Sequence, residues 1–178
     1  MTLGGGSNHV TLGDGNSHIV ASDAVGSANT ITVGVGANTV ALGAGNDSVQ
    51  VGSGSNLITA GNGAEVVVGG GGDNTVSLGS GQDSITLADG ANHISTADAV
   101  GIVDSIQAGN GNNQILVGQG NDAISAGNGA DTVTGGSGNN TVKLGSGPDS
   151  VTFGDGANQI TTADGAGMVD AMQVGNGN

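Results

Sequence analysis

Apolar and polar residues alternate in short stretches that recur every nine residues along the chain. From Gly34 the chain reads GVGANTVAL, GAGNDSVQV and GSGSNLITA, and each unit fits the pattern G-x-G-x-(N/D)-x-(V/I)-x-(L/V/A). Alternation with a period of two is typical of a strand that buries one face. The glycines that open each unit predict a tight turn, since Gly adopts positive φ without steric cost. Each unit therefore predicts one turn and one short strand.

Two such units, eighteen residues in all, are enough to close one coil of a solenoid. A single coil cannot bury its apolar face, so the coils must stack, about 4.8 Å apart, around a shared aliphatic core. We therefore expect an all-β fold, a parallel β-roll or β-solenoid with two nine-residue rungs per coil and about nine coils. It forms a single repeat domain over residues 1–178, and because the last unit is incomplete we expect it to be a segment of a longer protein.

Three units are longer, with twelve residues each, and they begin at Ser22, Ala97 and Ala163. Their second residues are Asp23, Asp98 and Asp164, and each long unit follows a unit that contains Asp14, Asp89 or Asp155. These aspartates suggest either an extra ligand site or simple turn formation. We favour turn formation, because the two members of each pair lie nine residues apart and thus on opposite edges of the roll.

The composition narrows the range of functions. The chain has 39 Gly and no Cys, Trp or Tyr, and 15 acidic residues face a single basic one, for a net charge of -14. Such a surface repels nucleic acid and attracts cations. No apolar run approaches the roughly 20 residues that span a bilayer, so no membrane insertion is expected. No Ser-His-Asp, HExxH or P-loop arrangement is present, and we expect no enzymatic activity.

The fifth position of each unit, just before the strand, carries the candidate chemistry. Alternate units lie on opposite edges of the roll, which sorts these residues into two stacks. Asp47, Glu65, Asp83, Asp104 and Asp122 share the first edge, and Asn38, Asn56, Asn74, Asn92 and Asn113 share the second. Beyond Asp122 the roles are exchanged: the first edge continues with Asn140 and Asn158, and the second with Asp131, Asp149 and Asp170.

Stacked carboxylates are costly without a cation. At about 5 Å and an effective dielectric constant of 20, each neighbouring pair repels by up to about 3 kcal/mol. Ca²⁺ fits such a stack, because it takes six to eight oxygen ligands from carboxylates and turn carbonyls. Stacked Asn side chains need no cation, since each amide offers the next both a donor and an acceptor. The alternative is that these acidic and amide side chains only cap their turns.

The units resemble RTX repeats, the glycine- and aspartate-rich motif G-G-x-G-x-D-x-U-x of proteins exported by bacterial type I secretion. The segments that carry the resemblance are GGGGDNTVS from Gly69, LGAGNDSVQ from Leu42, VGQGNDAIS from Val117 and LGSGPDSVT from Leu144. The resemblance implies Ca²⁺ in the turns and folding outside the cell. It carries over to Asp47, Asp83, Asp122, Asp131 and Asp149, and in the long units to Asp104 and Asp170. Two features depart from the motif: its first Gly is usually Leu, Val or Ala here, and more than half of the fifth positions are not acidic, which predicts partial calcium occupancy.

The function expected from these observations is a calcium-binding structural or adhesive module of a secreted bacterial surface or matrix protein, stiffened by Ca²⁺ and able to stack end to end. A self-assembling fibre held by Asn ladders is one alternative, and the repeat segment of a secreted enzyme is another. Ice binding by Thr and Ser on the outward strand face is a further one. That face carries Thr30, Thr32, Thr132 and Thr134 but is interrupted by residues such as Leu57, Val66, Val68, Leu116 and Lys143.

Overall fold

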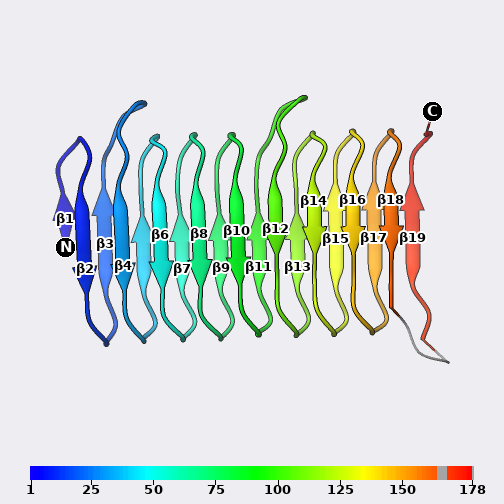
Figure 1. Ribbon diagram of the computed structural model, residues 1–178, viewed down its shortest axis with the longest axis horizontal. Coiled ribbons are helices and arrows are strands. Elements are labelled where there is room, and N and C mark those ends of the chain that lie inside the picture. The colour runs from blue at the N-terminus through cyan, green and yellow to red at the C-terminus, as the bar shows by residue number, and fades with distance from the viewer. Residues whose placement is uncertain (164–167, 178) are drawn as a thin grey trace.

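The computed structural model describes residues 1–163 and 168–177 of the chain, and all regular structure in these residues is β-strand. The chain winds as a solenoid of about nine turns, in which each turn contributes one strand to each of two parallel sheets (Figure 1). The predicted parallel β-roll is confirmed. Within the described residues there is no helix of the length and apolarity needed to cross a membrane.

The two sheets collect alternate strands. The ten-stranded sheet contains β1 (Thr2–Leu3), β3 (His18–Ala21), β5 (Thr39–Ala41), β7 (Leu57–Thr59), β9 (Thr75–Ser77), β11 (His93–Ser95), β13 (Gln114–Leu116), β15 (Thr132–Gly135), β17 (Ser150–Phe153) and β19 (Ala171–Val174). The nine-stranded sheet contains β2 (His9–Leu12), β4 (Thr30–Val33), β6 (Ser48–Val51), β8 (Val66–Gly69), β10 (Ser84–Leu87), β12 (Ser105–Gln107), β14 (Ala123–Ser125), β16 (Thr141–Lys143) and β18 (Gln159–Thr161).

The strand register follows the repeat. In an ordinary coil each residue pairs with the one 18 positions later, as Thr30 does with Ser48. In a coil that contains a long unit the offset is 21, as between Ser84 and Ser105. The three extra residues are therefore absorbed by the turn, and equivalent positions of every unit still stack in straight rows.

The core is a narrow aliphatic layer between the sheets. The seventh position of the nine-residue units, and the equivalent position of the first two long units, is Val or Ile and is buried from Val10 to Val151, for example Ile31, Val49 and Ile85. Ile160 is partly buried, and Met172 holds this position in the last unit and is exposed. The ninth position is mostly Val, Leu or Ala, with Phe153 in the penultimate coil. The fifth position is buried from Asn29 to Asp149 and half-buried in the first two and last two units. Most units therefore turn three side chains inward, and the one next to the turn is polar.

The long units bulge out of the roll. The loops between β3 and β4 and between β11 and β12 project on the same edge of the molecule (Figure 1). Most other turns pack tightly: a Cβ added at Gly72, which has φ +124°, would lie 2.6 Å from the carbonyl oxygen of Gly54. The long unit that begins at Ala163 falls partly on residues 164–167, outside the described part of the chain.

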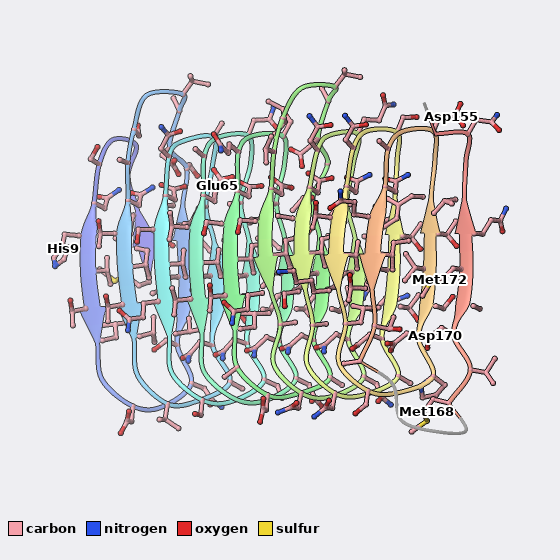
Figure 2. The ribbon with its side chains drawn as sticks, turned by 45° about the vertical axis from the view of Figure 1, so that its right-hand side comes forward. His9, Glu65, Asp155, Met168, Asp170 and Met172 are labelled. Carbon is pink, nitrogen blue, oxygen red and sulfur yellow. The ribbon has the colours of Figure 1, made fainter. Side chains whose placement is uncertain are left out.

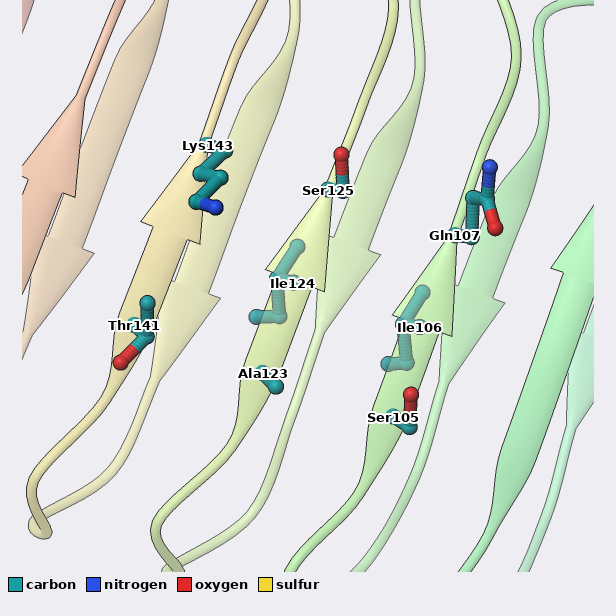
Figure 3. Close-up of a pocket in the computed structure, with 8 residues that line it drawn as sticks. All are labelled: Ser105, Ile106, Gln107, Ala123, Ile124, Ser125, Thr141 and Lys143. Carbon is teal, nitrogen blue, oxygen red and sulfur yellow. The ribbon is translucent and has the colours of Figure 1, made fainter.

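The outward face of the nine-stranded sheet is chemically mixed. Figure 3 shows a hollow over β12, β14 and β16, where the small Ala123 lies between Ser105 and Thr141, while Ile106 and Ile124 are buried beneath it. Gln107, Ser125 and Lys143 form the next row across the strands. His9 of this sheet, and His18 and His93 of the ten-stranded sheet, are exposed on their strands. The face thus lacks an unbroken row of Thr side chains here.

Candidate functional site

The fifth-position side chains form two continuous rows along the interior of the roll, one beside each line of turns. The first column comprises Asn8, Asn29, Asp47, Glu65, Asp83, Asp104, Asp122, Asn140 and Asn158. The second column comprises Ser17, Asn38, Asn56, Asn74, Asn92, Asn113, Asp131, Asp149 and Asp170. Except next to Glu65, the side-chain Oδ1 of one residue accepts the backbone N–H of its neighbour in the preceding coil. The predicted sorting onto two edges, with its exchange after Asp122, is confirmed.

An Asn in these columns has every polar atom paired. The Nδ2 of Asn56 donates to Gly52 O at 3.1 Å, to Gly54 O at 2.9 Å and to Asn74 Oδ1 at 2.9 Å. Asn74 repeats this arrangement with Gly70, Gly72 and Asn92. The amide N–H₂ group thus closes its own turn and also ties it to the next coil. A run of such residues forms a self-sufficient ladder.

An Asp in the same position keeps the hydrogen bond that Oδ1 accepts but loses those that the amide group donates. The Oδ1 of Asp83 accepts the N–H of Glu65 at 3.0 Å, and the Oδ1 of Asp104 accepts the N–H of Asp83 at 2.9 Å. The second oxygen replaces an N–H₂ group and cannot donate to a carbonyl. Buried carboxylate oxygens that find no hydrogen-bond donor in the described part of the chain belong to Asp23, Asp47, Glu65, Asp83, Asp98, Asp104, Asp122 and Asp131.

Burial raises the pKa of these carboxyl groups, because it disfavours their charged form. It raises the pKa of Glu65 to about 9, and the neighbouring Asp83 adds to this shift. It raises the pKa of Asp104 to about 8, with a further contribution from the Asp98 carboxyl. The same cause raises the pKa of Asp47, Asp83, Asp122 and Asp131. By contrast, hydrogen bonds from Asn110 lower the pKa of the exposed Asp89. A proton or a cation is needed to hold the column carboxylates in place.

The available ligands suit a hard cation. Each ordinary acidic turn offers a buried carboxylate and the glycine carbonyls that, in the Asn turns, accept the amide N–H₂ group. Oxygen ligands of this kind, carboxylate plus backbone carbonyl, are the set that Ca²⁺ prefers. No thiolate ligand is available, since the chain contains no Cys. The site residues therefore fit calcium better than a softer transition metal.

The structure places the predicted residues as follows. Asp47, Glu65, Asp83, Asp104 and Asp122 lie consecutively in the first column and are each at most 2% exposed. Figure 2 shows Glu65 at the edge of the roll from which the two long loops project. Asp131 and Asp149 lie in the second column and are equally buried, whereas Asp170, on the opposite edge from Glu65, is half-buried.

The aspartates of the long units differ in burial from those of the units that precede them. Asp14, Asp89 and Asp155 are exposed, and each accepts a backbone N–H of the next coil, at 2.7–2.8 Å. Asp23 and Asp98 are instead buried at 7% and 8% exposure, and each has a carboxylate oxygen without a donor in the described region. Simple turn formation does not explain them. Asp164 lies outside the described residues.

The burial of Asp23 and Asp98 follows from the extra length of the long unit. Sequence spacing placed these aspartates at the second position of a turn, where Asn62 and Gln119 are exposed. The three extra residues let the loop bulge, which redirects the second position inward. The signal in the sequence was the shared segment Asp-Ala-Val-Gly at both sites.

Comparison with protein families agrees with this geometry. The model of the RTX calcium-binding nonapeptide repeat, which describes four copies, matches residues 23–58, 59–94, 103–133, 125–160 and 134–169. No curated protein and no solved structure matches the chain. The matched segments cover well over half of the sequence and include seven of the eight predicted metal-site residues, all but Asp170. The family is a structural repeat family that binds calcium, and its proteins are typically secreted. The chain belongs to the RTX calcium-binding nonapeptide repeat family.

Proposed function

We propose that this chain is a calcium-binding structural module of a secreted bacterial cell-surface or matrix protein, and that Ca²⁺ in its acidic turns stiffens the roll. Its role is mechanical or adhesive rather than catalytic. The residues proposed to hold the ions are Asp47, Glu65, Asp83, Asp104, Asp122, Asp131, Asp149 and Asp170. The ion supplies positive charge and oxygen coordination that the protein itself cannot offer to these buried carboxylates.

One observation carries this proposal: the rows of buried carboxylate oxygens that no described donor reaches. Leaving a buried polar group unpaired costs about 1–3 kcal/mol, and more when the group is charged. The first column repeats this arrangement over five successive coils, from Asp47 to Asp122. At neutral pH, a roll with ionised carboxylates in its interior is stable only when cations bind between its coils. The roll then becomes rigid when it binds calcium outside the cell.

The test measures folding with and without the metal. Circular dichroism and thermal melting of the chain at pH 7.5 are recorded in EDTA, in Ca²⁺ and in Mg²⁺. Ca²⁺ is expected to raise the melting temperature strongly. Mg²⁺ is expected to do so weakly, because it loses its bound water reluctantly. Melting curves that coincide in EDTA and Ca²⁺ would contradict the proposal.

A matched pair of variants separates ligation from general charge. The triple variant Asp47→Asn/Asp83→Asn/Asp122→Asn removes three buried carboxylates, whereas Asp14→Asn/Asp73→Asn/Asp155→Asn removes three exposed ones. Both change the net charge equally. The first is expected to lose much of the calcium response, and the second to keep it. Equal losses in both would mean that calcium only screens the surface.

The Asn ladder supports a second candidate function, a self-assembling fibre. Five consecutive Asn residues of the second column, Asn38 to Asn113, are joined side chain to side chain and need no metal. Rolls with exposed strand ends can stack coil on coil in the same way. Electron microscopy in EDTA and in Ca²⁺ distinguishes the two functions. Filaments that form equally well in EDTA favour the fibre.

A further inference from the structure

The two long loops that lie within the described residues share sequence and backbone geometry. Both contain Asp-Ala-Val-Gly, and their glycines, Gly26 and Gly101, have the same φ of +92°. Each closes with a backbone hydrogen bond, from Ser27 N to Ala24 O at 3.1 Å and from Ile102 N to Ala99 O at 3.2 Å. The loops are thus two copies of one local structure. Their aspartate side chains differ: Oδ1 of Asp23 accepts the N–H of Gly43 in the following coil, whereas Oδ1 of Asp98 accepts the N–H of Gly81 in the preceding coil.

Asp98 is held rigidly by the coils on both sides of its loop. Its backbone carbonyl accepts the N–H of Gln119 at 3.0 Å, and its Oδ1 accepts the N–H of Gly81 at 3.2 Å. Its Oδ2 is buried and meets no donor in the described part of the chain. The loop therefore delivers one further carboxylate oxygen to the first column.

That oxygen meets two column carboxylates. Asp83, Asp98 and Asp104 each offer one ligand oxygen, and these atoms lie within 4.8 Å of one another. All three side chains are at least nine-tenths buried. This convergence of three buried carboxylates is denser than the simple column, in which each coil contributes one.

A buried neutral residue, Thr96, also indicates a polar site beside these carboxylates. Thr96 is 3% exposed, lies beside Asp104, and has a hydroxyl without a well-formed hydrogen bond to any described residue. It occupies the ninth position, which is Leu, Val or Ala in most units. A buried unpaired hydroxyl is unfavourable in an aliphatic core. Its presence here is explained if the hydroxyl contributes to a polar site beside Asp104.

The sister loop lacks these partners. There Asn29 stands where Asp104 stands, Asn8 stands where Asp83 stands, and Ala21 replaces Thr96. The amide of Asn8 donates to Asn29 Oδ1 at 2.8 Å, and the amide of Asn29 donates to Asp47 Oδ1 at 2.9 Å. Asp23 instead accepts the N–H of Gly43, in the following coil, at 2.7 Å, and its charge raises the pKa of Asp47 there. Among the described residues, no group of three carboxylates converges around Asp23.

We propose that the loop at Ala97 completes a dedicated cation site, formed by Asp83, Asp98 and Asp104, and that this is the tightest site of the roll. Its ligand is a hard divalent cation, Ca²⁺ first among them, because the site offers only oxygen and three negative charges. The loop at Ser22 forms no such site. This inference rests on the proposed function, since it assumes that the acidic turns bind calcium.

The test is a calcium titration by isothermal calorimetry on the full chain and on two matched variants. Asp98→Asn keeps the Oδ1 that accepts Gly81 N–H, so the fold is preserved, which circular dichroism checks. Asp23→Asn makes the same change in the sister loop. The tightest binding step is expected to weaken about tenfold or more in Asp98→Asn, by analogy with the loss of a metal-site partner. Asp23→Asn is expected to leave that step unchanged.

The outcomes separate the two proposals. Calcium binding by the wild-type chain with an unchanged tightest step in Asp98→Asn overturns the dedicated site and leaves the proposed function standing. An equal loss in Asp98→Asn and Asp23→Asn also overturns it, because only the loop of Asp98 faces Asp83 and Asp104. The absence of calcium binding in the wild-type chain overturns the proposed function and the dedicated site with it.

Discussion

At the scale of single residues, the exchange of one amide nitrogen for one oxygen decides how each turn is held. Asn113 and Asp131 lie in successive coils of the second column, and both use Oδ1 in the same way. The Nδ2 of Asn113 donates to Gly109 O, Gly111 O and Asp131 Oδ1. The equivalent oxygen of Asp131 has nothing to donate. Asn therefore stabilises the metal-free roll, whereas Asp makes it dependent on a proton or a cation.

The substitution Asp131→Asn is expected to raise the stability of the metal-free roll by about 1–3 kcal/mol, since it supplies the missing donor to a buried site. Urea denaturation in EDTA measures this change. The control is Asp73→Asn, an exposed residue whose Oδ1 accepts Ala91 N–H at 2.8 Å, for which little change is expected. A loss of stability in Asp131→Asn would show that its carboxylate is favourable without metal.

The raised pKa values of Glu65 and Asp104 predict an inverted pH dependence. A carboxyl whose pKa is higher in the folded state stabilises the fold fully below its unfolded pKa, near 4, and this contribution disappears as the pH rises through the folded pKa. For Glu65 and Asp104 that range extends to about 9 and about 8. In EDTA the melting temperature is therefore expected to fall steadily between pH 4 and pH 9.

The control for this pH dependence is the double variant Glu65→Gln/Asp104→Asn, measured in moderate salt to screen the surface charge. Its melting temperature in EDTA is expected to change less with pH than that of the wild type. Saturating Ca²⁺ is expected to flatten the wild-type curve above pH 6. A wild-type melting temperature that rises from pH 4 to pH 9 in EDTA would show that these carboxylates are not the dominant buried charges.

At the scale of elements, the strands are short, and the packing of each depends on the strands of the preceding and following coils. The ninth position varies between Gly and Phe, and the large and small residues complement each other across neighbouring strands. A Cβ added at Gly69 of β8 would lie 2.6 Å from the Leu87 side chain of β10. In the same way the Phe153 ring of β17 occupies the space beside Gly135 of β15.

The substitution Phe153→Ala is expected to destabilise the calcium-bound roll by about 3–5 kcal/mol, because it leaves a cavity beside Gly135. Adding Gly135→Val to this variant is expected to restore part of the loss, since the new side chain fills the vacated space. Gly135→Val alone is expected to destabilise, because its side chain would meet the Phe153 ring. Chemical denaturation of the four proteins gives the coupling, and simple additivity of the two losses would contradict the complementary packing.

At the scale of the whole molecule, a net charge of -14 on 178 residues opposes the compact state. Lys143 is the sole basic residue, so side-chain ion pairs relieve little of this repulsion. Two separate terms therefore destabilise the metal-free roll at neutral pH: long-range repulsion over the surface and the short-range cost of unpaired buried carboxylates. Salt screens the first term and leaves the second largely unchanged.

Sodium chloride and calcium are accordingly expected to act differently. Raising NaCl to about 1 M in EDTA shortens the Debye length to about 3 Å and should raise the melting temperature modestly. Millimolar Ca²⁺ at low ionic strength should raise it more, because it also satisfies the buried oxygens. Differential scanning calorimetry measures both effects. If NaCl alone reproduces the full calcium effect, specific ligation by the turns is not needed.

The sequence by itself determined the fold, the register and the two columns. A strict nine-residue period leaves one way to bury the alternating Val and Ile positions, and stacking in register then brings every fifth residue into line. Column membership, including the exchange between Asp122 and Asp131, follows from counting units. Counting units did not predict the burial of Asp23 and Asp98 in the long turns, because three added residues change the direction in which a side chain points.

Only the tertiary structure decided what surrounds the fifth position and the long loops. Oδ1 of nearly every Asn and Asp in the columns accepts a neighbouring N–H, which leaves one atom per residue to distinguish a paired turn from an unpaired one. Asp23 and Asp98 are alike in sequence and exposure, yet of the two only Asp98 joins two further carboxylates with ligand oxygens within 4.8 Å of one another. Burial and the identity of neighbours one coil away, eighteen or twenty-one residues distant, set the chemistry of such a site. Local sequence does not contain either.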